Sequence, residues 1–334
     1  MKIYEIGSGE GLGGLKAAQR EIPKPGPGEI LVKMKASSIN YRDLMMIKNA
    51  SVIGIAEGRI PNSDGAGIVV EAGDGVTSFK AGDRVVGCFF QDWEDGPIGD
   101  AVMQSALGGP IDGVLAEYVI LKEKSVLPIP EGLSFEEAAA LPCAAVTAWN
   151  CLIDKGGARA GDTALILGTG GVSVFSQQIA AVSGIRTIAT SSSDEKLERI
   201  KALGANELIN YRQNPDWEKE VLALTDGRGV DVVIEVGGAG TLPKSIDSVR
   251  VGGTISLVGV LTGGMIDPTS IMRKSVKLQG IYVGPRAMFR KLLQAIDTQD
   301  IKPVVEKTVP FDDAVEAYRL MESGAHFGKI VITF

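Results

Sequence analysis

The sequence contains few of the residues on which metal centres and disulfide frameworks depend. Of its 334 residues only one is histidine, His326, and three are cysteines, Cys88, Cys143 and Cys151. A single imidazole excludes histidine-rich metal sites, and a Ser-His-Asp triad would have to use His326. Three cysteines cannot form a disulfide framework, which favours a reducing compartment, and we expect a cytoplasmic protein.

The sequence also lacks the features of nucleic-acid-binding and membrane proteins. It carries 34 basic and 41 acidic residues, a formal net charge of −7, whereas binding to nucleic acid calls for basic stripes. No stretch reaches the roughly 18 apolar residues that span a bilayer. Residues 1–14 show no basic segment followed by an apolar run, so no signal peptide is expected. We therefore expect neither nucleic acid nor membrane as a partner.

The length and the order of the patterns predict two domains. The chain is 45% apolar and longer than the roughly 250–300 residues that usually share one core. Residues 1–123 are typical of a β-rich unit, and from about residue 134 strands alternate with helices, which predicts a parallel sheet. The predicted strands are 29–34, 67–71, 116–121, 163–167, 186–191, 207–210, 230–236, 254–260, 276–282 and 329–334, and residues 80–87 are predicted to be a turn that runs into a strand. The predicted helices begin at Ser134 and span 172–183, 194–203, 217–224, 289–297 and 311–321.

A glycine-rich turn is the strongest local signal. The segment 165–173 reads Leu-Ile-Leu-Gly-Thr-Gly-Gly-Val-Ser, so it follows a strand and opens a helix. Gly168 and Gly170 permit a tight turn and close approach to a pyrophosphate, and the helix start supplies free N–H groups. Ser173 stands where Gly or Ala is usual, so the match is imperfect. Because the turn lies within several strand–helix units, it favours a dinucleotide site over a plain tight turn.

The end of the next strand bears on the choice between NAD and NADP. An acidic residue there would bind the ribose hydroxyls of NAD, but the segment 189–196 reads Ala-Thr-Ser-Ser-Ser-Asp-Glu-Lys. Hydroxyls at Ser191 and Ser192 with the cation of Lys196 suit a 2′-phosphate, which favours NADP(H) over NAD(H). Alternatively, Ser192 and Glu195 form a capping box and Lys196 is a solvated helix charge; both interpretations can hold together.

Four short motifs together resemble the medium-chain dehydrogenase/reductase superfamily, most closely its zinc-independent, quinone-oxidoreductase-like branch. They are Asn-Tyr-Arg-Asp at 40–43, Asp-Gly-Ala-Gly at 64–67, Gly-Asp-Arg-Val at 82–85 and Gly-Thr-Gly-Gly-Val-Ser at 168–173. The resemblance extends over essentially the whole chain, to Gly-Lys-Ile-Val at 328–331. Several spaced motifs in the right order are specific for a fold and much less so for a substrate.

The resemblance implies an α/β fold in which a Rossmann doubly wound parallel sheet is inserted in a β-rich GroES-like catalytic domain. Residues 1–143 plus 284–334 would form the catalytic domain and residues 144–283 the Rossmann dinucleotide-binding domain, with the active site in the cleft. It also implies a homodimer through pairing of Rossmann sheet edges, for which the strands at 254–260 and 276–282 are the candidates.

Compared position by position, the resemblance implies a chain without zinc. Zinc-dependent members carry a Cys where this sequence has Asn40, a His where it has Ser63, and often a Cys where Cys143 stands. An amide, a hydroxyl and one thiol are not a zinc site, and the carboxylate of Asp64 does not complete one. The structural zinc lobe needs four closely spaced cysteines, and Cys88 is the only one nearby. We expect Cys143 to be a buried thiol.

The resemblance also assigns cofactor contacts. Thr147 matches a threonine that packs on the nicotinamide, Lys196 and Tyr211 match 2′-phosphate contacts of NADPH-type quinone reductases, and Lys329 matches a basic residue near the pyrophosphate. Tyr211 as a surface aromatic and Lys329 as an edge-strand charge remain alternatives. The full predicted cofactor set is Thr147, Gly168, Gly170, Gly171, Val172, Ser191, Ser192, Lys196, Tyr211, Val236, Gly237, Val258 and Lys329.

The chemistry that remains without zinc is hydride transfer to an acceptor already activated by conjugation. A quinone or an α,β-unsaturated ketone or aldehyde is such a small-molecule substrate, and negative charge develops on its oxygen. By family position Asn40 and Tyr41 are the predicted catalytic hydrogen-bond donors, with Tyr41 the preferred one and protonation by Tyr41 or by solvent. Alternatively, Tyr41 only packs in the cleft. Arg42 and Asp43 are expected to be an orienting structural pair.

Other interpretations remain open. The segment 88–110 replaces the zinc lobe and is either a loop that covers an apolar substrate or a plain surface insertion. The same phosphate-binding turn also fits an NAD(P)-dependent alcohol dehydrogenase-like enzyme or a non-catalytic nicotinamide-binding sensor protein.

Overall fold

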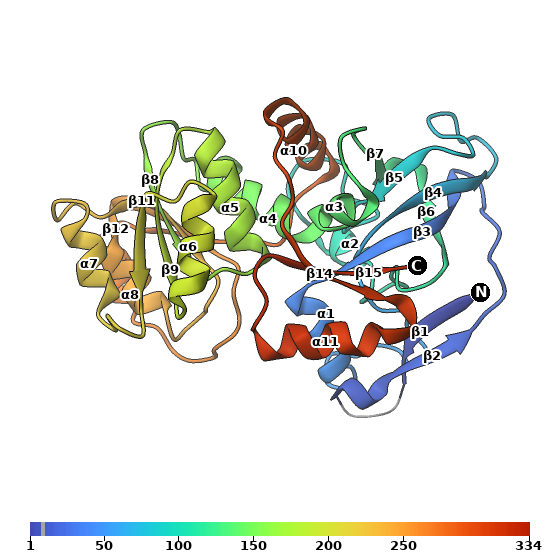
Figure 1. Ribbon diagram of the computed structural model, residues 1–334, viewed down its shortest axis with the longest axis horizontal. Coiled ribbons are helices and arrows are strands. Elements are labelled where there is room, and N and C mark those ends of the chain that lie inside the picture. Colours follow the sequence, from blue (N-terminus) through green and yellow to red (C-terminus); the bar gives the residue numbers. More distant parts are fainter. Residues whose placement is uncertain (8–10) are drawn as a thin grey trace. The chain divides into compact units, whose positions relative to one another are not determined.

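In the computed structural model, which describes residues 1–7 and 11–334, the chain folds into two compact units (Figure 1). Unit 1 comprises Met1–Ala144 and Pro285–Phe334, and unit 2 comprises Ala145–Gly284. Each boundary lies one residue from the division expected from the sequence. Unit 2 is therefore an insertion between two segments that fold together.

Unit 2 is built on one parallel sheet. Its strands are β8 (Thr163–Leu167), β9 (Arg186–Ser191), β10 (Glu207–Asn210), β11 (Val230–Glu235), β12 (Val249–Leu257) and β13 (Lys277–Gly280). They lie in the order β10-β9-β8-β11-β12-β13, and each neighbouring pair is parallel. Counted from β8, this is the 3-2-1-4-5-6 order of a doubly wound dinucleotide-binding sheet, whose direction of winding reverses between β8 and β11.

Both faces of this sheet are covered. Every residue of β8 and β11 is buried, and the side chains of a strand point to both faces of its sheet. Leu165, Ile188, Val233 and Ile255 belong to the core of the unit. The helices are α4 (Val146–Trp149), α5 (Gly171–Val182), α6 (Asp194–Ala202), α7 (Trp217–Ala223), α8 (Leu242–Ser248) and α9 (Pro268–Arg273), with a π-helical turn, η4, at Asn150–Asp154.

Unit 1 is the β-rich unit that the sequence predicts. Its larger sheet runs β14-β15-β3-β4-β5-β7, with β6 also paired to β3, and β1 and β2 form a separate two-stranded sheet. The core between these elements includes Ile30, Val32, Leu44 and Ile332. The strands are β1 (Lys2–Ile6), β2 (Leu15–Gln19), β3 (Glu29–Ile39), β4 (Asp64–Ala72), β5 (Arg84–Gly87), β6 (Tyr118–Lys122), β7 (Val126–Pro128), β14 (Val305–Pro310) and β15 (Lys329–Thr333).

Unit 1 also contains helices, one of which begins as the sequence predicts. At the start of α3 Ser134 is the N-cap, and it forms the expected capping box with Glu137. No helix among residues 1–7 and 11–334 is both long and apolar enough to cross a bilayer. The helices are α1 (Tyr41–Lys48), α2 (Asp100–Met103), α3 (Phe135–Ala139), α10 (Arg286–Gln299) and α11 (Ala314–Ser323), with the short turns η1 (Gly11–Gly14), η2 (Glu123–Ser125), η3 (Leu141–Ala145) and η5 (Phe311–Asp313).

Several strands differ in extent from the prediction, and the differences are largest for β3 and β12. β3 runs to Ile39, five residues beyond the predicted end, because Ser37 and Ser38 are buried and donate to the carbonyls of Asp64 and Ile330. The two serine hydroxyls thus form their hydrogen bonds inside the sheet, and the strand continues past them. β12 begins at Val249 and ends at Leu257, whereas the apolar run predicted 254–260. The longer β3 carries the chain to Asn40 at the start of α1.

Candidate active site and cofactor site

The glycine-rich turn in unit 2 has the geometry of a phosphate-binding site. Gly168 has φ +72°, a conformation that glycine adopts without strain. Gly170 is the N-cap of the 12-residue helix α5, and no side chain caps that end. A Cβ atom added at Gly170 would meet nothing within 4 Å, and one at Gly168 would meet only Val236 Cγ2, at 4.0 Å. Open space therefore lies beside free N–H groups and the positive end of a helix dipole.

Ser173 explains how this turn tolerates its departure from the usual glycine pattern. The side chain is buried, and its hydroxyl donates to the carbonyl of Leu167 at 2.7 Å. That bond joins the first turn of α5 to the end of β8 and satisfies the buried Ser173 hydroxyl. A serine here keeps the helix close to the strand, which is the role that a smaller residue has in the usual pattern.

The residues predicted to select the cofactor lie at the ends of β9 and β10. Ser191 ends β9 and pairs in register with Asn210, and the next residue, Tyr211, donates its backbone N–H to the Ser191 carbonyl at 3.1 Å. Tyr211 is 40% exposed. Lys196 is half-buried in the first turn of α6. The residues that carry these hydroxyls, this cation and this aromatic ring therefore follow the ends of two neighbouring strands at one corner of the sheet.

The alternative interpretation of this segment, a capping box formed by Ser192 and Glu195, is wrong. The N-cap of α6 is Ser193 rather than Ser192, and the Ser193 hydroxyl oxygen accepts the N–H of Lys196 at 3.3 Å. Ser192 and Glu195 therefore do not form the reciprocal pair. The sequence did not show which of the three consecutive serines begins the helix, because each of them suits an N-cap. With Ser193 in that role, the Ser192 side chain is not needed to start the helix.

The loops that follow β11 and β12 are joined to each other. Thr262 donates its N–H to the Gly237 carbonyl at 3.1 Å, and Val258 donates to the Glu235 carbonyl at 2.9 Å. The predicted contacts Val236, Gly237 and Val258 thus belong to one continuous surface at the same edge of the sheet as Gly168. Thr147, in α4 of the same unit, is buried.

Glu235 is a buried residue next to this surface, and it was not among the predicted site residues. It ends β11, its side chain is buried, and its carboxylate accepts four hydrogen bonds. One signal was present in the sequence, namely an acidic residue that directly follows the apolar run Val-Val-Ile and precedes Val-Gly-Gly.

In unit 1 a buried polar cluster surrounds Asn40. The Lys329 ammonium donates to Asn40 Oδ1 at 2.6 Å and to the Ile39 carbonyl at 2.7 Å. Asn40 Nδ2 lies 3.5 Å from Ser63 Oγ, whose hydroxyl donates to Asp64 Oδ1 at 2.6 Å. Asp64 Oδ2 accepts the backbone N–H of Cys143 at 2.9 Å. A chain of hydrogen bonds therefore connects a buried ammonium group to a buried carboxylate.

Burial shifts the ionisation of each charged member of this cluster. Desolvation lowers the pKa of Lys329, and the carboxylate of Asp64 acts in the opposite direction. Desolvation raises the pKa of Asp64, and Lys329 opposes that shift. Burial also raises the pKa of the Cys143 thiol far above its usual range, so Cys143 is held as a neutral thiol.

The donor set around Asn40 does not fit a zinc ion. Among residues 1–7 and 11–334, no group of three or more His, Cys, Asp or Glu side chains is arranged to hold a metal. Zinc requires thiolate, imidazole or carboxylate ligands, whereas here the Asn40 oxygen already accepts an ammonium group and Cys143 favours the thiol form. We therefore derive no step that involves a metal ion.

The two predicted catalytic donors have different environments. Asn40 is buried, and its backbone N–H donates to Asp43 Oδ2 at 2.8 Å. Tyr41, the first residue of α1, is 40% exposed. Arg42 pairs with the buried Asp43 at 3.1 Å and donates to the Leu107 carbonyl at 2.7 Å, so this pair has the expected structural role. Lys329, predicted near the pyrophosphate, is 2% exposed in unit 1, and its cofactor contact stays a prediction.

The segment 88–110 contributes buried aromatic side chains to unit 1. Phe89, Phe90 and Trp93 are buried, and the Phe90 and Trp93 rings are 5.5 Å apart. The guanidinium of Arg42 lies 4.9 Å from the Phe89 ring centroid, which ties the segment to α1. The aromatic side chains therefore pack inside unit 1; whether the segment also covers a substrate stays a prediction.

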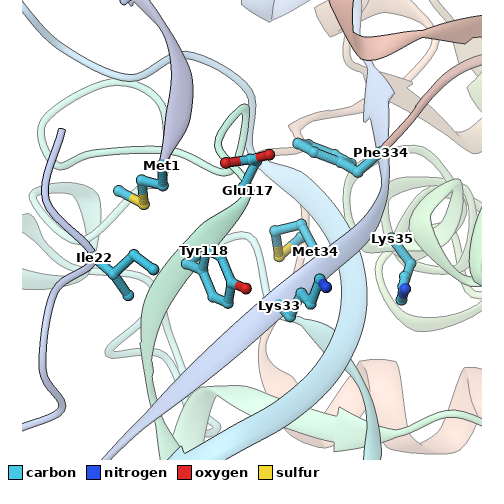
Figure 2. Close-up of a pocket in the computed structure, with 8 residues that line it drawn as sticks. All are labelled: Met1, Ile22, Lys33, Met34, Lys35, Glu117, Tyr118 and Phe334. Atoms are coloured by element: carbon cyan, nitrogen blue, oxygen red, sulfur yellow. The ribbon is translucent and has the colours of Figure 1, made fainter. Parts of the chain in front are cut away.

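A separate pocket of unit 1, of about 490 Å³, lies beside the two chain ends (Figure 2). None of the residues predicted for catalysis or cofactor binding lines it. Its polar groups come mainly from side chains on β3 and β6, and it lacks the convergent buried donors of the Asn40 cluster. Its lining residues are Met1, Ile22, Lys33, Met34, Lys35, Glu117, Tyr118 and Phe334.

Two family models match the chain in succession. Residues 26–131 match the alcohol dehydrogenase GroES-like domain, and residues 171–298 match the zinc-binding dehydrogenase family. A zinc-type alcohol dehydrogenase-like protein of Schizosaccharomyces pombe is 44% identical over 327 residues, which cover 95% of this chain and 94% of the relative. The quinone oxidoreductase of Rattus norvegicus is 27% identical over 340 residues, which cover 99% and 96%.

The fold also matches solved structures along its whole length. The crystal structure of a putative alcohol dehydrogenase from Sinorhizobium meliloti has a TM-score of 0.92 and 40% sequence identity. The match covers 100% of this chain and 99% of that one. The likeness therefore includes both units rather than the nucleotide-binding sheet alone.

Proposed function

Because the chain belongs to the medium-chain dehydrogenase/reductase superfamily, we propose that it transfers a hydride from NADPH to a conjugated carbonyl acceptor without zinc. It is an NAD(P)-dependent oxidoreductase, as are the alcohol dehydrogenases and quinone oxidoreductases that it resembles. The proposed acceptor is a quinone or an α,β-unsaturated ketone or aldehyde. The nicotinamide supplies the hydride when it is bound, and the residues of the chain orient it and stabilise charge.

The Asn40 cluster is the observation that carries this proposal. Its amide, hydroxyl and neutral thiol cannot polarise a simple carbonyl as a Lewis acid would. An acceptor in which conjugation already delocalises the incoming charge needs less activation. Asn40 and Tyr41 are the proposed hydrogen-bond donors to the acceptor oxygen, where negative charge develops. Tyr41 is the preferred donor, and the proton comes from Tyr41 or from solvent.

The preference for NADPH rests on the end of β9. Serines occupy residues 191–193, and no carboxylate stands at the strand tip to bind both ribose hydroxyls. Lys196 and Tyr211 lie at the same corner and would hold a 2′-phosphate through charge and hydrogen bonding. The glycine turn fits either reduced coenzyme, so the proposed preference for NADPH depends on this corner of the sheet.

A panel of acceptors tests the proposed function. The purified protein is incubated with NADPH or NADH and with quinones, enones or saturated aldehydes, and the absorbance of the reduced nicotinamide is followed. We expect consumption of NADPH only with conjugated acceptors. Elemental analysis of the same preparation should show far less than one zinc per chain. Stoichiometric zinc, or turnover limited to saturated carbonyls, would contradict the proposal.

An alcohol dehydrogenase-like activity is the second candidate function. It is favoured by the name of the Schizosaccharomyces pombe relative, a zinc-type alcohol dehydrogenase-like protein at 44% identity. This candidate predicts reduction of NADP⁺ or NAD⁺ in the presence of primary or secondary alcohols. A non-catalytic nicotinamide sensor, in turn, would bind NADPH and oxidise it with no acceptor of the panel.

We also propose that the protein is a homodimer joined at β13. This strand ends the sheet of unit 2, and strand edges pair readily with a second copy. Apolar side chains at Val260, Leu261, Met265 and Met272 are exposed in the segment before it. Light scattering after gel filtration should give twice the chain mass, and Leu261→Asp combined with Met265→Asp should yield monomers. A wild-type monomer at micromolar concentration would contradict the proposal.

A further inference from the structure

Glu235 is an acidic residue buried at the edge of the sheet where the glycine turn lies. It ends β11, the strand next to β8, and its residue exposure is 0%. The protein interior strongly disfavours a charged carboxylate unless hydrogen bonds or opposite charge compensate for the lost water. The hydrogen bonds that compensate for burial of Glu235 therefore show what its carboxylate holds in place.

The Glu235 carboxylate organises the loop that follows its own strand. Oε1 accepts the N–H groups of Gly237 at 2.7 Å and Gly238 at 3.1 Å. Oε1 also accepts the hydroxyl of Thr241 at 2.6 Å, and Oε2 accepts that of Ser245 at 2.5 Å. Four donors on one carboxylate fix both the turn and the first residues of α8. Charge-assisted bonds of this kind are roughly twice as strong as neutral ones.

The backbone of Glu235 holds the second loop. Its carbonyl accepts the N–H groups of Val258 at 2.9 Å and Gly259 at 3.0 Å. The two loops approach so closely that a Cβ at Gly259 would lie 1.8 Å from the Val236 carbonyl oxygen. Gly238, with φ +95°, completes the contact through a bridge to Thr262. One residue thus sets the positions of both loops.

We propose that Glu235 is a positioning residue for the nicotinamide cofactor. Through its carboxylate and its carbonyl it preforms the surface made by Val236, Gly237 and Val258, without itself touching the cofactor. The proposal rests on the proposed function to the extent that these three residues contact the bound nucleotide. A site preformed in this way avoids the entropic cost of ordering two loops when the nucleotide binds.

Three variants separate this role from a general effect on stability. Glu235→Met keeps the volume and removes all four acceptor contacts, so the dissociation constant for NADPH should rise at least tenfold. Glu235→Gln retains an oxygen towards Gly237, Gly238 and Thr241, and its affinity should stay within about threefold of wild type. Asp231→Asn is the matched control, because Asp231 is a hydrogen-bonded acid at the opposite end of the same strand. It should leave NADPH affinity unchanged.

The measurement is a fluorescence titration of NADPH without any acceptor, together with thermal unfolding of each variant. If Glu235→Met fails to fold, the double variant Thr241→Val/Ser245→Ala, which removes two of the four donors, should weaken NADPH binding about threefold. Wild-type affinity in folded Glu235→Met or in that double variant overturns the proposal, as does an equal loss in Asp231→Asn. Failure of the acceptor panel would contradict the proposed function and leave this order of affinities intact.

Discussion

The Lys329 ammonium lies 2.6 Å from Asn40 Oδ1, and this contact fixes the orientation of the Asn40 amide. An ammonium group only donates hydrogen bonds, so it must face the amide oxygen, and the Nδ2 group is left to act as the donor. The Nδ2 group therefore points to the side of Ser63. Lys329 in β15 thus determines which end of the Asn40 amide can donate a hydrogen bond, although the two residues are almost three hundred positions apart.

Removal of this ammonium group should destabilise the protein. We expect Lys329→Met to lower the free energy of unfolding by about 3 kcal/mol, because the buried carboxylates of Asp64 and Asp43 lose their compensating charge. The double variant Lys329→Met/Asp64→Asn should recover at least half of that loss. Urea unfolding monitored by circular dichroism measures both values. Equal stability of Lys329→Met and wild type would show that the ammonium does not compensate these carboxylates.

A valine at Gly170 should abolish cofactor binding without disturbing the fold. The backbone of Gly170 is extended, with φ −77°, and the space beside it is open, so the side chain fits but fills the predicted pyrophosphate position. We expect the dissociation constant for NADPH to rise more than a hundredfold. Gly99→Val is a matched control, since Gly99 is also an extended N-cap with open space around it. Unchanged NADPH binding by Gly170→Val would place the phosphates elsewhere.

Lys196→Ala should weaken the binding of NADPH much more than that of NADH. Loss of one charge-assisted contact to a 2′-phosphate corresponds to about 1.5–3 kcal/mol, or roughly ten- to a hundredfold in affinity. Lys201→Ala, an exposed position in the same helix, should change neither constant by more than about twofold. Titration of each variant with both coenzymes measures the ratio. Equal losses for the two coenzymes would argue against the 2′-phosphate contact.

Tyr41→Phe should lower kcat for a conjugated acceptor by about a hundredfold, the usual effect of losing a general acid or an oxyanion donor. The KM for NADPH should stay within about twofold, because the substitution removes only the hydroxyl of Tyr41, a half-exposed residue that is not among the predicted cofactor contacts. Tyr118→Phe, in the pocket beside the chain ends, serves as the control and should leave both constants unchanged. A kcat of wild-type size in Tyr41→Phe would show that the Tyr41 hydroxyl is not the donor.

Acid should destabilise unit 2 through Asp231. Burial raises the pKa of Asp231, but hydrogen bonds from Arg228, Thr163 and Arg250 outweigh it and hold the pKa at about 2, below the usual 3.8. The folded form therefore binds the proton less readily than the unfolded chain, so the stabilisation is complete above about pH 4 and disappears as the pH falls towards 2. Unfolding midpoints between pH 2 and 6 should fall less steeply for Asp231→Asn than for wild type.

Much of the fold followed from local patterns in the sequence. The alternation of apolar runs and helix starts predicted the strands 163–167, 186–191 and 207–210 with their observed bounds. The first of these is a short apolar run because it is a central parallel strand, buried on both faces. The fold class is confirmed by the strand order and by the two family matches. Patterns were less informative where buried serines continue β3, since their hydroxyls bond to carbonyls from distant parts of the chain.

The sequence by itself determined the glycine turn at the head of α5 and the hydroxyl-rich end of β9. Each depends only on residue types within a few positions of one another. Only the tertiary structure decided that Lys329 holds the Asn40 amide and that Glu235 joins two loops, because those contacts form between strands that a linear pattern does not connect. Hydrogen bonds in a sheet depend on register and strand order, which the whole fold establishes.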